Sequence, residues 1–129
     1  MQADIINDAL VAIKNAEAVG KSEITLKPTS KLLTGILKLM QQSGYVGDFE
    51  YVENNRGGEI NLKLVHKINK CGVIKPRFSV KRDEFEKWEQ RYLPARDFGV
   101  LMVSTSQGLM THNNSKEKDI GGRLIAYVY

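Results

Sequence analysis

Three consecutive hydroxyl side chains in the last third of the chain are well suited to contact oxygen-rich ligands. The segment reads Ser104-Thr105-Ser106-Gln107-Gly108. The apolar run 100–103 before it predicts a strand, and residues 111–118 after it predict a short helix. A junction of this kind gathers hydroxyls and free backbone N–H groups, which suits phosphate or sugar oxygens. Alternatively, the hydroxyls belong to an ordinary loop and cap the helix.

A second candidate site for anions lies where another helix is predicted to begin. Its residues are Lys27, Ser30 and Lys31, and the helix is predicted over 28–43. The first N–H groups of a helix have no partner within the helix, so phosphate oxygens are attracted there. Capping of the helix by the same hydroxyls explains the pattern equally well.

Two weaker candidates complete the set. Lys14 and Asn15 stand near the end of a helix predicted over 4–19, where an exposed pair is ordinarily just surface. Gly121 and Gly122 precede the closing strand 123–129 and permit close approach of a ligand to the backbone. A plain turn accounts for the two glycines as well.

Signatures of catalysis and metal binding are absent from the sequence. Ser106, His112 and Asp119 supply the residue types of a hydrolase triad, but no G-x-S-x-G motif surrounds the serine. There is no phosphate-binding glycine loop ending in Lys-Ser or Lys-Thr. With two histidines and one cysteine, Cys71, no metal-ligand spacing occurs. We therefore expect no enzyme activity, no metal and no cofactor.

Charge is segregated along the chain although the net charge is only +4. Acidic residues are absent from 24–47, 60–82 and 98–116, which all contain lysine. Segregation of this kind predicts a basic face suited to nucleic acid. No apolar run reaches the roughly 20 residues of a membrane helix, and no secretory signal opens the chain. A cytoplasmic protein is expected.

The predicted elements describe an α+β fold of two small packed subdomains. Residues 1–68 read as an αβαββ subdomain, 69–73 as a polar hinge, and 74–129 as a mixed β-α-β-α-β subdomain carrying the hydroxyl segment. The first strand of the second subdomain is predicted over 74–81, from alternating apolar and polar residues. Phe85, Trp88 and Tyr92 share one face of a predicted helix, which indicates core rather than a surface for stacking bases.

The same features occur in a characteristic order at the end of the chain. They are Gly99, the apolar run, the hydroxyls, Gly108, Leu109-Met110, Gly121-Gly122 and an aromatic C-terminus. Ser30-Lys31 and Gly44-Tyr45-Val46 continue the pattern upstream. This pattern resembles the family of the eighth protein of the small ribosomal subunit. Arg123 follows the glycine pair where bacterial members usually have an acid, which resembles the archaeal and eukaryotic branch.

The resemblance implies a structural RNA-binding protein that binds a helical element of the central domain of small-subunit rRNA and aids subunit assembly. It also implies contacts with neighbouring small-subunit proteins and, in some relatives, with their own messenger RNA. The implied RNA-binding residues are Lys14, Asn15, Lys27, Ser30, Lys31, Ser104, Thr105, Ser106, Gln107, Gly108, Gly121 and Gly122. Two other classes remain open: a phosphate-handling enzyme that uses 104–108 as an anion cradle, and a protein-interaction module without RNA.

Overall fold

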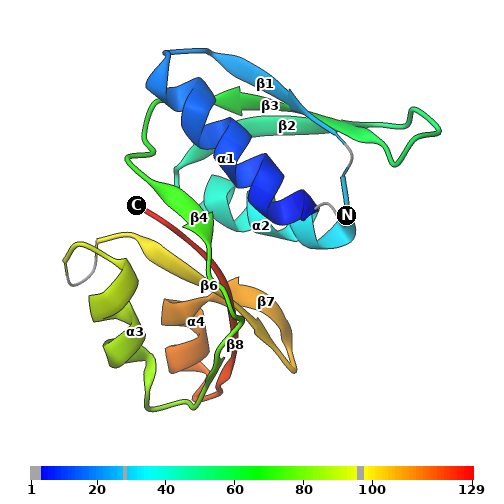
Figure 1. Cartoon of the computed structure of the whole chain (residues 1–129). Coiled ribbons are helices and arrows are strands. Elements are labelled where there is room, and N and C mark those ends of the chain that lie inside the picture. Colours follow the sequence, from blue (N-terminus) through cyan, green and yellow to red (C-terminus); the bar gives the residue numbers. More distant parts are fainter. Residues whose placement is uncertain (1–3, 28, 96–97) are drawn as a thin grey trace. The chain divides into compact units, whose positions relative to one another are not determined.

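The computed structural model describes residues 4–27, 29–95 and 98–129. Within them, four helices and two antiparallel sheets form an α+β protein, as predicted (Figure 1). The chain divides into two compact units, residues 1–70 and 71–129. Pro28, at the predicted start of the second helix, lies outside the described residues, as do residues 1–3 and 96–97.

Unit 1 has the predicted αβαββ order. Its three-stranded sheet has the order β1-β3-β2, and both strand pairs are antiparallel. The β2–β3 hairpin projects beyond the two helices (Figure 1). The elements are α1 (Ile5–Ala18), β1 (Glu23–Leu26), α2 (Lys31–Gln42), β2 (Val46–Val52) and β3 (Glu59–Leu64).

Local signals explain both helices of unit 1. The Asp4 carboxylate accepts the Asn7 N–H at 3.0 Å and begins α1, while the Ser30 hydroxyl accepts the Leu33 N–H at 3.1 Å and begins α2. Each helix buries one apolar stripe, which includes Leu10 in α1. These stripes cover one face of the sheet, because alternate residues of β3 are buried and the others exposed.

Unit 2 is built on a sheet of order β4-β8-β6-β7, and the short β5 also pairs with β8. It contains two more short strands than the sequence suggested, because β4 and β5 replace one predicted strand and β7 was not predicted. The elements are β4 (Cys71–Val73), β5 (Ser79–Val80), α3 (Phe85–Tyr92), β6 (Val100–Thr105), β7 (Gly108–Thr111), α4 (His112–Glu117) and β8 (Gly122–Val128).

The segment that follows the boundary between the two units differs from the prediction. Residues 71–73, predicted to be part of a hinge, form β4, in which Cys71 pairs with Val128 and Val73 with Ala126. The strand predicted over 74–81 is interrupted from Ile74 to Phe78. Pro76 lies in this interruption and has no N–H to donate to a strand ladder. Pairing with the distant C-terminal strand therefore decides the structure here, and local polarity does not.

The core of unit 2 contains the predicted aromatic stripe. Phe85 and Trp88 are buried, and the Trp88 ring stacks on Phe78 with 4.5 Å between ring centroids. Leu101 and Leu124 pack in the same cluster. The aromatic side chains of α3 thus hold the helix to the sheet, as the sequence predicted.

Candidate nucleic-acid interface

The hydroxyl segment forms a β-hairpin. Thr105 ends β6, Ser106 and Gln107 form the turn, and Gly108 begins β7 opposite Thr105. The expected junction between a strand and a helix is therefore corrected: a second strand follows the turn, and α4 begins only at His112. Gly108 closes the turn with φ of +108°, a conformation that favours glycine.

The three hydroxyls of the hairpin have different roles. The Thr105 hydroxyl donates to the Gly108 carbonyl oxygen at 2.8 Å and accepts the Gln107 N–H at 3.1 Å. It therefore fixes the shape of the turn. Ser104 and Ser106 are exposed, and no hydrogen bond occupies their hydroxyls within the described residues. These two hydroxyls are available to a ligand, and so is the exposed Gln107 side chain.

The glycine pair lies where β8 passes between two other strands. A Cβ atom on Gly121 would overlap the carbonyl oxygen of Val80 in β5. One on Gly122 would overlap the carbonyl oxygen of Ser104 in β6. Packing of neighbouring backbones thus requires both glycines, and it places Gly122 directly against the hydroxyl hairpin.

Arg123 is a member of this surface that the sequence reasoning left out of the RNA-binding set. It pairs with Ser104 across β6 and β8, and both residues are exposed. Directly opposed residues of neighbouring strands extend to the same face, so a guanidinium lies beside the hydroxyl hairpin. Its charge, next to apolar Leu124, made the exposure of Arg123 readable from the sequence. The pairing with Ser104 was not.

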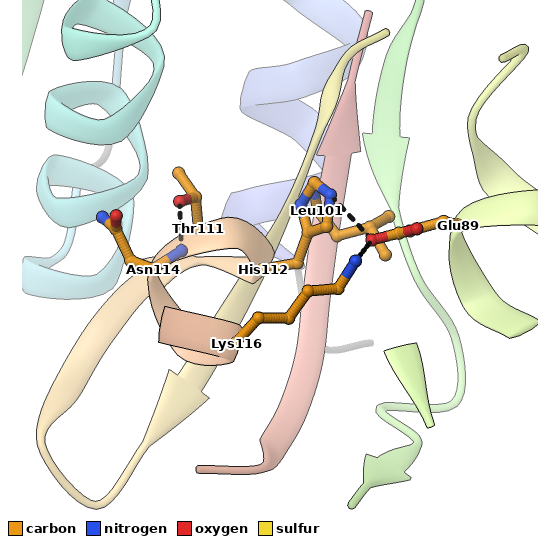
Figure 2. Close-up of polar contacts among 6 residues, drawn as sticks. All are labelled: Glu89, Leu101, Thr111, His112, Asn114 and Lys116. Atoms are coloured by element: carbon orange, nitrogen blue, oxygen red, sulfur yellow. Dashed lines mark hydrogen bonds and ion pairs between the residues drawn. The ribbon is translucent and has the colours of Figure 1, made fainter. Parts of the chain in front are cut away.

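A buried histidine ties the hairpin to both helices of unit 2 (Figure 2). His112 Nδ1 accepts the Leu101 N–H at 3.0 Å, which assigns the proton to Nε2. His112 Nε2 lies 3.2 Å from Glu89 Oε1, and Lys116 forms an ion pair with the same carboxylate. Because His112 directly follows β7, this network anchors the base of the hairpin. Its partners are far apart in sequence, so no local pattern signals it.

The remaining predicted residues belong to unit 1. Ser30 caps α2, and the Thr34 hydroxyl donates to its carbonyl oxygen at 3.0 Å. Lys27 and Lys31 are exposed on either side of this cap. Lys14 and Asn15 are exposed near the end of α1. The capping interpretation of Ser30 is confirmed, while the adjacent lysines are available to an anion.

A family model described as ribosomal protein S8 matches residues 4–129, which includes the hydroxyl hairpin, the glycine pair and the start of α2. The chain belongs to the ribosomal protein S8 family. It is accordingly a ribosomal protein of the small subunit, part of a ribonucleoprotein and of the translation machinery, in a family that binds rRNA.

The S8-family assignment agrees with the arrangement of the residues considered for catalysis. The ring nitrogens of His112 are engaged by Leu101 and Glu89, and the Asp119 carboxylate binds Arg82 at 3.0 Å. Ser106 lies in the hairpin turn. These residues therefore do not assemble a Ser-His-Asp relay. The family role is structural rather than catalytic.

The described part of this S8-family chain contains no group of three His, Cys, Asp or Glu side chains suited to hold a metal ion. None of the helices in residues 4–27, 29–95 and 98–129 combines the length and apolar character needed to cross a membrane.

Proposed function

We propose that the hairpin 104–108, together with Arg123, binds a helical element of the central domain of small-subunit rRNA and aids subunit assembly. The supporting observation is that Ser104 and Ser106 carry exposed, unpartnered hydroxyls on a turn whose shape Thr105 fixes. Contacts with neighbouring small-subunit proteins in the cytoplasmic ribosome form part of the proposal.

The mechanism is readout of RNA shape. The shallow minor groove of an RNA helix displays 2′-hydroxyls and base edges, and a serine hydroxyl both donates to and accepts from such groups. The space around Gly108 is open, since a Cβ atom there would meet no heavy atom within 4 Å. RNA backbone therefore approaches the turn without obstruction. Arg123 supplies a charge-assisted contact to a phosphate beside Ser104.

In this proposal, residues of unit 1 hold a second stretch of the RNA backbone. Lys27 and Lys31 flank the Ser30 cap and attract phosphate, and Lys14 with Asn15 adds a weaker contact on α1. These contacts position the protein and carry no sequence information. Discrimination between RNAs therefore resides in the hairpin.

The test is a binding titration of the full chain with a short helical fragment from the central domain of small-subunit rRNA and with a scrambled hairpin. Ser104→Ala and Ser106→Ala should each weaken binding to the authentic fragment by about 1 kcal/mol, roughly fivefold, with an unchanged salt dependence. Ser22→Ala, at an exposed serine of unit 1, is the matched control and should bind as the wild type does. Messenger RNA serves as a competitor in the same titration.

Three outcomes would contradict the proposal. Equal and steeply salt-dependent binding to both RNAs would leave only a basic surface. A rise in melting temperature with mononucleotides, without binding of the rRNA fragment, would favour a phosphate-handling enzyme. Capture of a partner protein that is insensitive to nuclease, without rRNA binding, would favour a protein-interaction module.

A further inference from the structure

A basic groove of about 570 Å³ runs along α2 in unit 1. One wall is the exposed face of the helix, where Lys31, Thr34 and Lys38 lie at a spacing that places them on the same side. The opposite wall comes from the β2–β3 hairpin and contains Tyr51 and Gly57. Among the described residues, no acidic side chain lines this groove, so its charge is positive.

Tyr51 presents an aromatic ring that is fixed in place and half exposed. Its exposed fraction is 51%. The hydroxyl donates to the Glu53 carboxylate at 2.9 Å, and the ring packs so closely over Gly58 that a Cβ there would overlap it. A hydrogen bond and a close backbone contact at the hydroxyl end of the ring limit its rotation. Such a ring offers a flat surface for stacking at little ordering cost.

The groove also contains hydroxyl groups with spare capacity. Ser30 lines it, and its hydroxyl accepts the Leu33 N–H and keeps its proton free to donate. Thr34 uses its hydroxyl proton on the Ser30 carbonyl and keeps lone pairs free to accept. Two ammonium groups, two hydroxyls and one fixed ring match the parts of a nucleotide: phosphate, ribose and base.

We propose that this groove binds an unpaired segment of RNA, with one base stacked on Tyr51 and the adjoining phosphates on Lys31 and Lys38. The inference rests on the proposed RNA-binding function and deepens it by naming the class of RNA that unit 1 takes. Stacking on an aromatic ring requires a base outside a helix, because the faces of a paired base are already covered. The Glu53 carboxylate beside Tyr51 accepts from the Tyr51 hydroxyl and from the Asn55 N–H at 3.1 Å.

The experiment measures binding of hexaadenylate to the full chain by amide chemical shifts. Shift changes should concentrate at Lys31, Thr34, Lys38 and Tyr51 and be absent from the hairpin 104–108. Tyr51→Leu should weaken binding at least about fivefold, while Tyr51→Phe keeps the ring and should stay within about twofold of the wild type. Lys38→Gln should lower the slope of log affinity against log salt by about 0.7.

Control ligands separate stacking from charge attraction. A ribose-phosphate hexamer without bases should bind more weakly than hexaadenylate, and hexaglutamate should compete poorly. Equal binding of the baseless hexamer, or full binding by Tyr51→Leu, would overturn the proposal. If Tyr51→Leu failed to fold, the baseless hexamer and Lys38→Gln would still decide the question.

The result is distinguishable from the test of the hairpin. Hexaadenylate forms no base-paired helix, so the Ser104→Ala and Ser106→Ala variants should bind it as the wild type does. Loss of rRNA recognition with intact hexaadenylate binding would refute the hairpin proposal alone. Intact recognition of the rRNA fragment with loss of hexaadenylate binding would refute the groove proposal alone.

Discussion

The hydroxyl hairpin of unit 2 and the α2 groove of unit 1 are both suited to RNA but are built differently. The hairpin presents short side chains on a turn held by the Thr105 hydroxyl and anchored at His112. The groove presents two long, exposed lysines around one fixed ring, Tyr51. The hairpin thus offers hydrogen-bonding groups at defined positions, and the groove offers charge and a stacking surface.

This difference indicates that the two regions contribute differently to RNA binding. Short hydroxyls on a rigid turn lose little side-chain entropy on binding, and they discriminate because each bond needs a partner at one position. Long lysines attract any phosphate and tolerate many geometries. The hairpin should therefore set specificity for a helix, while the groove should contribute affinity for unpaired backbone.

The largest effect that separates the two regions is expected for Glu89→Ala. Removal of the carboxylate takes the Glu89 Oε1 acceptor away from the buried His112 ring, at a cost of about 1–3 kcal/mol in the free energy of unfolding. Each kcal/mol lost should lower the melting temperature by about 4 °C, since a chain of 129 residues lies between the size classes for which the shift is larger and smaller. Amide hydrogen exchange should accelerate in β6 and α4, below the unfolding transition, more than in α2.

Glu89→Gln is the matched control. Its amide oxygen still accepts from His112, although the ion pair with Lys116 is lost, so most of the stability should be retained. Binding of the helical rRNA fragment should weaken in Glu89→Ala, with hexaadenylate binding unchanged. Exchange that accelerated equally in both units would refute the anchoring role of this network.

Local signals in the sequence predicted the helices of unit 1 almost to their ends. Asp4 and Ser30 occur as caps directly before apolar stripes, so each helix start is encoded within a few residues. The hairpin differs, because residues 104–108 suit either a loop before a helix or a tight turn. The register of β6 with β7 and β8 decides between them, and registers are set by tertiary pairing.

The sequence predicted the candidate site in the same partial way: it indicated which residues form the site but not how they are arranged. The hydroxyls of Ser104 and Ser106 were found because they are adjacent to one another and to a glycine. The role of Thr105 within the turn, and the position of Arg123 beside Ser104, depend on backbone geometry that a linear pattern does not contain. The pairing of Glu89 with His112 brings a helix to the end of a strand. Composition signals no such contact.

A smaller effect concerns the salt dependence of binding to the two RNAs. Arg123→Gln should lower the slope of log affinity against log salt by about 0.9 for the helical fragment, through one lost phosphate contact. It should leave hexaadenylate unaffected, because Arg123 lies beside the hairpin. Lys31→Gln should lower the slope for both RNAs, since Lys31 belongs to the α2 start and to the groove. Titrations at several salt concentrations measure both slopes, and identical effects of the two variants would remove the distinction between the regions.

The smallest expected effect is a shift in the titration of Tyr51. The hydrogen bond to Glu53 raises the pKa of Tyr51 above its usual 10.0, with smaller contributions from burial and from the Glu53 charge. The same bond lowers the pKa of Glu53 below 4.5. Because the pKa of Tyr51 is raised, the contribution of its hydrogen bond to stability is complete below pH 10.0. This contribution is lost as pH rises through the folded-state pKa of Tyr51. Because the pKa of Glu53 is lowered, the contribution of its carboxylate to stability is present above pH 4.5 and is lost as pH falls through the folded-state pKa of Glu53.

The ring should therefore stay fixed between the folded-state pKa of Glu53 and that of Tyr51. The affinity for hexaadenylate should not change over this pH range. Absorbance at the phenolate band, with the Tyr51→Phe titration subtracted to remove the other tyrosines, isolates Tyr51. Glu53→Gln should return its midpoint toward 10.0, because a neutral amide stabilises the phenol less and no longer repels the phenolate. An unchanged midpoint would mean that Glu53 does not hold the ring in solution. The groove would then lack the fixed stacking surface that distinguishes it from a patch of lysines.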